Sequence, residues 1–540
     1  KCVIKLSRGK ESSSSSNQCT QLAMTGGPSM ASSGKKLSMT KQNELNTLVD
    51  TLIKHSFLKT PTVNEQFAQY QEMYSVLERI RKLESELKLK TSNGKPRQAN
   101  IEAFCRWAKE HGCQFDGIKI SEFSGFELGL EATRDFSAGE VFVTVPRKLI
   151  FSVTADSKIP DIMKDIPVMM VQNLSNLMLA LLLIVERFQP SSVWKPYLDV
   201  LPDRYSTVLY MTPADMAELK GTSAFVPALN QCKNIARQYG FIKKFIQTKT
   251  ALLKDNFTYD LYCWAASTVM TRQNLIPVNL REEDEKEEGG QGGEAAGTAE
   301  STPKETAPNP VLIPLWDMAN HVNGQITTGY NEAAQQVESL ALRDYRKGDQ
   351  IFIYYGNRTN GDFLVHNGFV YPDNANSAVA IPLSLNPTEE LFEQRKQLLE
   401  KLGLASSGDF NVHRGNGGYI SPELLGFARV FNMTKDQLAH WTAAEDAAVQ
   451  SLLTADCPGL EAGLREKVWK YLSIRLQLAL RMTGTTLEQD ETLLAGQGQK
   501  GAQKLGHIRS MLVQFRVVEK KILSEALEFC KQKEMDKKDV

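Results

Sequence analysis

The segment IPLWDMANHVNGQITTGY, residues 313–330, contains a histidine in a setting that could do chemistry, His321. Asn320 comes directly before it, Asp317 stands four residues earlier, and a polar turn with Gly324 follows. A histidine in such a setting can ligate a metal, act as a base, or hydrogen-bond the backbone inside the core. These three alternatives make different demands on the rest of the sequence.

Neither a metal centre nor a serine hydrolase is indicated. The chain has seven histidines, and no two of them are close enough to form an H-x-x-x-H pair. Asp317 and His321 could share one face of a helix, but two ligands do not make a zinc site. The G-x-S-x-G motif of serine hydrolases is absent. We therefore expect no bound metal, and the residues by themselves favour a structural histidine.

The elements that must position these residues follow from the periodicity of the apolar side chains. Spacings of three and four at 44–90 predict amphipathic helices, and alternation around a Ser-Ala-Gly turn at 126–150 predicts short antiparallel strands. Helical patterns return at 160–275, strand patterns at 311–356, and helical patterns again from about 390 onward. The chain is therefore predicted to be α+β, with a helical insertion inside a strand-rich unit and a helical domain behind it.

Two segments have compositions that cannot bury a core. Residues 1–43 are rich in serine and lysine, with Glu11 as the one acidic residue, and residues 281–310 consist mainly of Glu, Gly, Ala, Thr and Pro. We expect both segments to be disordered, and the acidic run to be a solvated linker and not a binding site.

Composition restricts the partners and the compartment. Lysine plus arginine and aspartate plus glutamate number 63 each, so no global positive field holds a polyanion, which argues against nucleic acid as the main partner. The longest apolar run, 177–185, is too short to cross a bilayer. Eight scattered cysteines without a C-x-x-C pair are typical of reduced thiols. We expect a monomer without a membrane partner, located in the cytoplasm, with the nucleus as a further location.

Several motifs occur along the chain in a characteristic order: VWKPYLDVLP, ARQYG, VMTRQNLIP, LIPLWDMANHVNGQITTGYN, YYG and HNGF. They resemble the motifs of SET-domain methyltransferases, in the branch that carries a helical insertion and a C-terminal domain like that of the Rubisco large-subunit methyltransferase. Within this branch the chain resembles the actin-histidine N-methyltransferases over residues 44–515. The resemblance implies a pseudoknotted antiparallel β SET core with a helical insertion, followed by an all-α C-terminal domain.

Composition, periodicity and the resemblance together predict a division of the chain into segments, although the resemblance does not cover the head or the acidic loop. These are a disordered head at 1–43, an N-terminal helical segment at 44–115, the SET domain at 116–356 with its helical insertion at about 160–275 and its acidic loop at about 281–310, a post-SET segment with the Rubisco methyltransferase-like substrate-binding helical domain at 357–515, and a helical tail at 516–540.

The cofactor that the resemblance implies is S-adenosylmethionine. The matching positions are Arg97, Phe126, Glu127, Leu128, Arg272, Asp317, Met318, Ala319, Asn320, His321, Asn367, Gly368 and Phe369. The two signature segments of the family match Asn320-His321 and Tyr354-Tyr355-Gly356. His321 would be a structural residue inside this site, with its ring stabilising the crossing of these two segments. Glu127 departs from the family, because most SET proteins carry the first glycine of a Gly-x-Gly pair there.

The activity that the resemblance implies is protein-histidine N-methylation, with actin as the substrate. The matching substrate positions are Arg272, Gln273, Asn274, Trp316, Tyr355 and Arg358, of which Asn274 and Tyr355 would be catalytic. An amide at 274 can fix one ring nitrogen of a histidine so that the other presents its lone pair. A protein-lysine N-methyltransferase and an inactive SET scaffold that only binds protein remain as alternatives.

Overall fold

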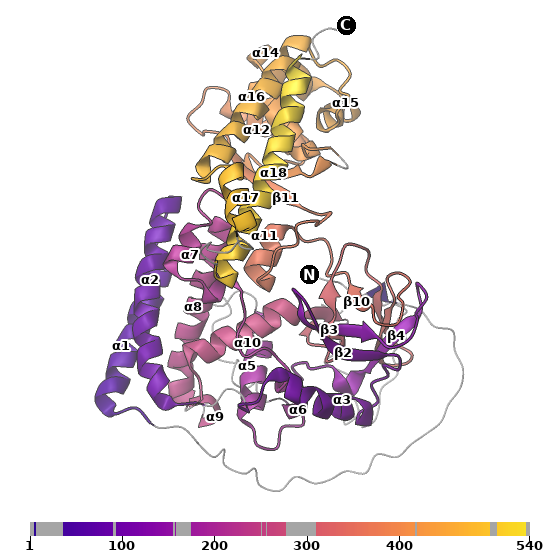
Figure 1. Ribbon diagram of the computed structural model, residues 1–540. Helices are drawn as coiled ribbons and strands as arrows, with labels where there is room; N and C mark the ends of the chain where they lie inside the picture. Colours follow the sequence, from indigo (N-terminus) through magenta and orange to yellow (C-terminus); the bar gives the residue numbers. More distant parts are fainter. Residues whose placement is uncertain are drawn as a thin grey trace, which may run out of the picture. The chain divides into compact units, whose positions relative to one another are not determined.

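The computed structural model describes residues 5–6, 36–89, 93–154, 157, 174–249, 251–254, 256–276, 309–415, 418–496 and 505–535. The chain divides into two compact units (Figure 1). Unit 1 comprises Lys1–Tyr205 and Cys232–Asn357, and unit 2 comprises Ser206–Gln231 and Arg358–Val540. The disorder predicted for the head and the acidic loop falls mostly outside the described residues.

Short strands make up the centre of unit 1. They are β1 (Lys5–Leu6), β2 (Ile118–Phe123), β3 (Glu127–Ala132), β4 (Val141–Pro146), β5 (Asn274–Ile276), β6 (Asn309–Val311), β7 (Asn320–His321), β8 (Thr328–Asn331), β9 (Gln336–Leu340) and β10 (Gln350–Ile353). Their sheets have the orders β2-β3-β10-β7, β1-β8-β9-β4 and β5-β6. The pairs are antiparallel except β7 with β10 and β1 with β8, which are parallel.

Unit 1 also contains many helical elements. The helical elements are α1 (Met39–Ser56), α2 (Val63–Glu84), η1 (Ser85–Leu87), η2 (Arg97–Asn100), α3 (Ile101–Glu110), η3 (Arg147–Leu149), α5 (Leu174–Phe188), α6 (Lys195–Leu198), α9 (Ala251–Lys254), α10 (Tyr259–Arg272) and η7 (Trp316–Met318). Helix α8 (Phe225–Lys249) belongs to unit 1 from Cys232 onward. The α+β fold class is confirmed. Helix α10 is buried along most of its length and packs against α5, so its C-terminal end holds Arg272 in a fixed place.

Two boundaries in unit 1 differ from the predicted ones. Helix α1 begins at Met39 and not near 44, because the Ser38 side chain caps it by accepting a hydrogen bond from the Lys41 amide. At the end of the acidic loop, Asn309 and Pro310 pair with β5 as part of β6. In the predicted head, Lys5–Leu6 forms β1, a strand beside β8.

A buried ion pair joins three helices of unit 1. The Glu84 carboxylate at the end of α2 lies 3.0 Å from Nζ of Lys243 in α8. It also accepts a 2.7 Å hydrogen bond from the hydroxyl of Tyr239 and another from the amide of Tyr259. All of these side chains are buried, so the contact ties the N-terminal helical pair to the insertion.

Unit 2 is built mainly from helices. Besides the start of α8, its elements are η5 (Val208–Tyr210), α7 (Pro213–Ala217), α11 (Asn360–Asp362), the π-helical turn η8 (Phe363–Asn367), β11 (Ala378–Ser384), α12 (Phe392–Lys401), β12 (Ser407–His413), α13 (Pro422–Asn432), α14 (Lys435–Ala443), α15 (Asp446–Gln450), η10 (Ser451–Leu453), α16 (Ala462–Met482), α17 (Leu487–Ala495) and α18 (His507–Met535). None of the helices in the described part of the chain is long and apolar enough to span a membrane.

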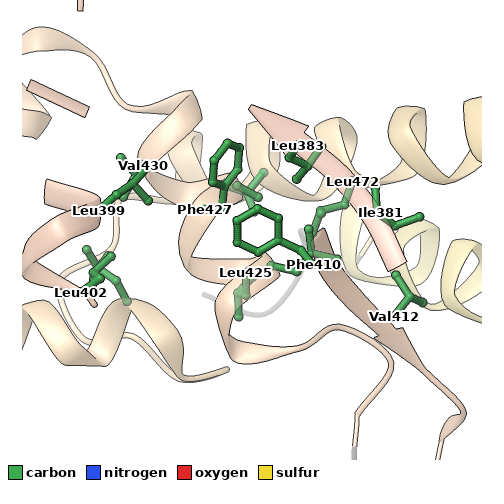
Figure 2. Close-up of a cluster of buried hydrophobic side chains, with 14 of the residues drawn as sticks. Ile381, Leu383, Leu399, Leu402, Phe410, Val412, Leu425, Phe427, Val430 and Leu472 are labelled. Atoms are coloured by element: carbon green, nitrogen blue, oxygen red, sulfur yellow. The ribbon is translucent and has the colours of Figure 1, made fainter. Parts of the chain in front are cut away.

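The prediction of an all-α domain is wrong in one respect, since unit 2 contains the antiparallel pair β11–β12. Ile381 and Phe410 face each other in this pair, and Figure 2 shows both in the apolar cluster with the ring of Phe427. Strand β12 has the sequence of a loop, because Gly, Asp and Asn occupy its exposed positions and have low β-propensity. It forms a strand because β11 pairs with it. The predicted boundary at 515/516 falls inside α18, whose Phe515 and Arg516 are both buried.

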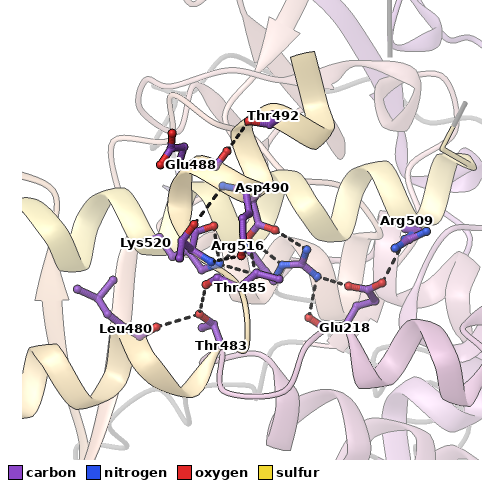
Figure 3. A network of polar contacts seen from close by, with 12 residues as sticks. Glu218, Leu480, Thr483, Thr485, Glu488, Asp490, Thr492, Arg509, Arg516 and Lys520 are labelled. Atoms are coloured by element: carbon purple, nitrogen blue, oxygen red, sulfur yellow. Dashed lines mark hydrogen bonds and ion pairs between the residues drawn. The ribbon is translucent and has the colours of Figure 1, made fainter. Parts of the chain in front are cut away.

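A polar network holds α17 against α18 in unit 2 (Figure 3). Asp490 of α17 is fully buried and accepts hydrogen bonds from Nε and Nη2 of Arg516, at 3.0 and 2.6 Å. The Lys520 ammonium lies 2.5 Å from the same carboxylate, and the Arg516 guanidinium also pairs with Glu218. Asp490 is the buried residue of α17, so this short helix is held chiefly by charge.

Candidate functional site

The two signature segments lie side by side in unit 1. Strand β7 runs parallel to β10, with Asn320 opposite Phe352 and His321 opposite Ile353. Beyond the paired residues, the Tyr355 amide donates a 3.2 Å hydrogen bond to Nδ1 of His321. Since His321 is buried and tied to the neighbouring segment, its ring stabilises this contact and is not placed as a solvent-accessible base.

The first residues of strand β3 (Glu127–Ala132) reach the same place. Nδ2 of Asn320 donates a 3.1 Å hydrogen bond to the carbonyl oxygen of Leu128. Gly129 permits this approach, because a Cβ atom there would lie 2.9 Å from Asn320 Nδ2 and 2.5 Å from Gln350 Nε2. The Phe126 ring contacts Phe352 edge-on at 5.6 Å and stays partly exposed. The structure thus brings the predicted residues 126–128 next to the Asn-His segment.

Glu127 adopts the backbone conformation that a glycine would favour, with φ at +58°. The departure from the family pattern therefore leaves the left-handed geometry in place and adds a side chain to it. That side chain is exposed, and its Oε2 lies 3.2 Å from Nη1 of Arg97. Arg97 is held from behind, because its Nε donates a 2.8 Å hydrogen bond to the carbonyl oxygen of Val200.

Arg272 and Asp317 form a buried ion pair beside this loop. Nη1 of Arg272 donates a 2.7 Å hydrogen bond to the Asp317 carbonyl oxygen and lies 3.3 Å from its Oδ2. The same Oδ2 accepts a 2.6 Å hydrogen bond from the hydroxyl of Tyr197 in α6. Burial works against the charge of Arg272, but Asp317 and then Tyr205 raise its pKa above the ordinary value, so it stays a cation.

The charges of this region favour an anionic ligand. Burial, and then the positive charge of Arg272, lowers the pKa of Arg97. Burial raises the pKa of Asp317, while Arg272 opposes that change. Burial, followed by the charge of Asp317, raises the pKa of Tyr197 well above its usual value, so its phenol keeps the proton that it donates. Two neighbouring guanidinium groups would therefore be stabilised by a carboxylate between them.

Several polar atoms around this ion pair are buried and have no hydrogen-bond partner within the part of the chain that the structure describes. They are Nε of Arg272, Oε1 of Gln273, Oδ1 of Asn274 and Oδ1 of Asp317. Buried polar groups in native proteins are normally satisfied, so a cluster of exceptions marks a place where a ligand or water completes the bonding. Within the same described residues, no three His, Cys, Asp or Glu side chains are grouped to hold a metal ion.

Tyr355 and Trp316 are anchored by their polar ends. The Tyr355 hydroxyl donates a 2.7 Å hydrogen bond to the Ala319 carbonyl oxygen, which leaves the lone pairs of the phenol oxygen for another group. The Trp316 indole donates to the hydroxyls of Thr328 at 3.0 Å and Ser339 at 3.2 Å, so its ring is fixed against β8 and β9. Met318 contributes its sulfur, 4.0 Å from Nη1 of Arg272.

The remaining predicted residues belong to unit 2. Nη1 of Arg358 donates a 2.8 Å hydrogen bond to Oδ1 of Asn367. The Phe369 ring stacks on Phe363 with centroids 4.7 Å apart. Gly368 has φ at +74°, and a Cβ atom there would lie 2.6 Å from the Thr207 amide nitrogen, so this tight turn requires glycine. These contacts connect the predicted residues between Arg358 and Phe369 within unit 2.

Sequence reasoning missed three contributors to the site in unit 1. Tyr197 and Val200 lie in the motif VWKPYLDVLP, which pointed to the family without giving these residues a role. Their contacts to Asp317 and Arg97 cross more than a hundred residues of sequence, at separations of 120 and 103. Leu315 is buried with φ at +69°, a strained conformation for a bulky residue, directly before Trp316.

Comparisons with known proteins agree with this geometry. The family model for the SET domain matches residues 127–356, and the model for Rubisco LSMT substrate-binding matches residues 386–523. The solved "SET domain of LSMT bound to Lysine and AdoHcy" has a TM-score of 0.62 at 21% identity, covering 81% of this chain and 92% of that chain. Rubisco LSMT bound to AdoMet has a TM-score of 0.59 at 20% identity, covering 82% of this chain and 93% of that chain. These likenesses establish the fold.

Curated relatives give the family. The actin-histidine N-methyltransferase of Drosophila melanogaster is 36% identical, covering 93% of this chain and 92% of that relative. The protein of the same name from Canis lupus familiaris is 34% identical, covering 92% and 79% respectively, and that from Danio rerio is 34% identical, covering 90% and 76%. The chain belongs to the actin-histidine N-methyltransferase family of SET-domain methyltransferases.

Proposed function

We propose that this protein transfers a methyl group from S-adenosylmethionine to a histidine of actin. Curated relatives that span most of the chain carry this activity in their names. The observation in this chain that carries the proposal is the buried amide of Asn274, which has an unsatisfied acceptor. A protein-lysine N-methyltransferase is expected to have an apolar and aromatic channel for the lysine stem.

The residues of unit 1 fit the cofactor. Arg97 and Arg272 supply two cations for the carboxylate of its amino-acid end, and the orphan Oδ1 of Asp317 is an acceptor for its ammonium. The backbone of the Asn320-His321 segment offers further polar groups. When bound, S-adenosylmethionine supplies a methyl group on a positively charged sulfur, which keeps the electron pair of the broken C–S bond.

The orientation of the Asn274 amide follows from its surroundings. Its Nδ2 lies 3.5 Å from the carbonyl oxygen of Arg272, which can only accept a hydrogen bond. The amide nitrogen therefore faces that carbonyl, and Oδ1 is the atom left to meet a substrate. The group presented to the substrate is an acceptor, and the substrate must bring a donor to it.

A neutral imidazole meets this requirement. It has one N–H and one nitrogen with a lone pair, and an acceptor that takes the N–H holds the lone pair in a fixed direction. With a reference pKa near 6.5 the ring is mostly neutral at about pH 7, so no strong base is needed before attack. In a lysine the N–H groups sit on the attacking nitrogen itself, and the long stem needs an apolar and aromatic channel.

Tyr355 completes the substrate side of the site. Its hydroxyl proton is committed to the Ala319 carbonyl oxygen, so its oxygen faces a methyl group with lone pairs only. As the imidazole nitrogen forms the new N–C bond, the ring becomes positively charged. Asn274 Oδ1 stabilises the charged ring through the remaining N–H, and that proton leaves to water when the product departs.

The substitution Asn274→Val tests this proposal, because valine fills similar space without an acceptor. We expect transfer to a histidine-containing actin peptide to fall roughly 100-fold, the effect of a misplaced nucleophile, with unchanged affinity for S-adenosylmethionine. Rates are measured by mass spectrometry, and affinity by calorimetry. The control is Thr271→Val, three residues from Asn274, since the Thr271 hydroxyl bonds the Ser267 carbonyl within its own helix at 2.8 Å.

The other outcomes separate the alternatives. An Asn274→Val protein that methylates histidine at the original rate contradicts the orienting role. A wild-type protein that methylates only the peptide with lysine in place of the histidine is a lysine methyltransferase. A wild-type protein that does not bind S-adenosylmethionine is a scaffold without transfer activity.

We further propose that the protein acts as a monomer in the cytoplasm, where actin is abundant, and also in the nucleus. The state of its cysteines supports a location in a reducing compartment. The six in the described part of the chain form no disulfide there, and all but Cys105 are buried. Fractionation of cells that express a tagged protein tests the location, and sedimentation tests the monomer.

A further inference from the structure

We propose that Tyr197 of α6 is a positioning residue for cofactor binding, acting through Asp317 on Arg272. The inference rests on the proposed function, in that it takes the region around Arg272 as the site for S-adenosylmethionine. In the sequence, Tyr197 is part of the motif VWKPYLDVLP and has no role assigned to it.

The first support is the geometry of one carboxylate oxygen. Oδ2 of Asp317 accepts the 2.6 Å hydrogen bond of Tyr197 and lies 3.3 Å from Nη1 of Arg272. Tyr197 is fully buried, and the side chain of Asp317 is 1% exposed. Water therefore does not replace the phenol as a donor, and the orientation of the carboxylate depends on it.

The second support is the position of α6 in unit 1. The turn after this helix also holds Arg97, through the 2.8 Å hydrogen bond to the Val200 carbonyl oxygen. The turn is itself anchored, because Nη1 of Arg187 donates to the Leu198 carbonyl oxygen at 2.8 Å. One short segment thus positions both guanidinium groups of the site. Its Tyr197 side chain acts on Arg272 through Asp317, and its Val200 carbonyl oxygen holds Arg97.

The electrostatics explain why a phenol is suited to this place. Arg272 and Arg97 repel each other, and the buried carboxylate of Asp317 offsets that repulsion only while it is charged. A neutral donor such as the Tyr197 hydroxyl stabilises the carboxylate without adding a third positive charge. Loss of the hydroxyl would leave Oδ2 one donor short in a buried place, and the Arg272 guanidinium would lose its fixed direction.

Unit 1 contains a matched control for this contact. Tyr239 of α8 is also fully buried and donates a 2.7 Å hydrogen bond to a buried carboxylate, that of Glu84. The Glu84 contact joins α2 to α8 and involves none of the residues of the site. Tyr197→Phe and Tyr239→Phe therefore remove the same chemical group from the same kind of bond, and differ only in what that bond positions.

The experiment measures S-adenosylmethionine binding by calorimetry and thermal stability for the full-length wild type and both variants. We expect both substitutions to lower the melting temperature, but only Tyr197→Phe to raise the Kd, by roughly tenfold, as expected for a lost hydrogen bond to a buried charge. In assays, Tyr197→Phe should raise the KM for S-adenosylmethionine while kcat at saturation stays near that of the wild type.

Equal Kd values for Tyr197→Phe and Tyr239→Phe would overturn the inference while leaving the proposed function intact. If Tyr197→Phe does not fold, Asp317→Asn takes its place, since it keeps the shape and removes the charge that the phenol supports. A Kd unchanged in Asp317→Asn would then overturn the inference. Absence of binding by the wild type would overturn both the inference and the proposed function.

Discussion

Each unit buries an arginine against an aspartate, and the two pairs differ in how completely their polar atoms are satisfied. In unit 2 the Asp490 carboxylate receives donors from Arg516, Lys520 and the Thr485 hydroxyl (Figure 3). In unit 1 the Asp317 carboxylate receives its donors on Oδ2, while its Oδ1 and Nε of Arg272 have no partner within the described part of the chain.

This difference distinguishes a saturated structural network from a candidate binding site. A saturated buried network has no polar atom left for a ligand. Its hydrogen bonds and ion pairs therefore stabilise the packing of α17, α18 and α7 against one another. An unsaturated cluster is unfavourable until a ligand supplies the missing bonds. The same residue types therefore serve different purposes, and the count of unsatisfied atoms indicates which purpose applies.

The units also differ in backbone strain. The non-glycine residues with positive φ among the described residues are Lys88, Glu127, Leu315 and Gln335, and all belong to unit 1. Two of them lie in the candidate site: Glu127 is one of the predicted cofactor residues, and Leu315 stands two residues before Asp317. In unit 2, glycine takes the left-handed positions of the described segments. Strain also occurs at Lys88 and Gln335, so it motivates a test at Glu127 and does not identify a site by itself.

The largest expected effect tests the saturated network. Asp490→Asn leaves the Arg516 and Lys520 charges buried without their shared anion, which should lower the free energy of unfolding by roughly 3–5 kcal/mol. Denaturant unfolding followed by helical circular dichroism measures it. The neighbouring pair of Glu491 and Lys521 is half-exposed, so Glu491→Gln should change the free energy by less than about 1 kcal/mol. Similar losses in both variants would contradict the structural role of the network.

A buried carboxyl, Glu519, with no cation among the described groups that shift its pKa, offers an intermediate case. Burial raises the pKa of Glu519 from 4.5 to about 7, and donors from Ser223 oppose the shift only partly. Because the fold prefers the protonated form, its contribution to stability is full below about pH 4.5 and is lost as the pH rises to about 7. Glu519→Gln mimics the protonated form, so we expect it to exceed the wild type by up to about 3 kcal/mol at about pH 8.

Melting temperatures between pH 4.5 and pH 8 measure this difference. The gap between Glu519→Gln and the wild type should close as the pH falls. Glu528 is exposed on the same helix, and Glu528→Gln should follow the wild type at every pH. A gap that does not change with pH would show that Glu519 is not the titrating group.

The smallest expected effect concerns strain at the site. Glu127→Gly removes a side chain from a left-handed position and should raise the free energy of unfolding by about 1 kcal/mol. It also removes the carboxylate near Arg97, so the affinity for S-adenosylmethionine should change. Lys88→Gly is the control, because Lys88 is exposed with φ at +51° and should gain similar stability with unchanged affinity. Equal affinities in both variants would show that Glu127 has no influence on the site.

The sequence by itself determined the fold class, the order of the elements and the family. Amphipathic periodicity is local, so it identifies α1, α2 and the α18 region without knowledge of their partners. The motifs around Asn274, His321 and Tyr355 were recognisable because their residues stand at fixed spacings along the chain. Composition predicts disorder for the Ser-rich head and the acidic loop, which lie mostly outside the described residues.

The tertiary structure alone decided which groups complete the site and which strands complete the sheets. Tyr197 meets Asp317 across 120 residues, and Val200 meets Arg97 across 103, because α6 packs where no local pattern could place it. Strand β12 exists because β11 pairs with it, since its own residues favour a loop. Hydrogen bonds require atoms placed to within tenths of an ångström, and only the packing of distant segments fixes positions so closely.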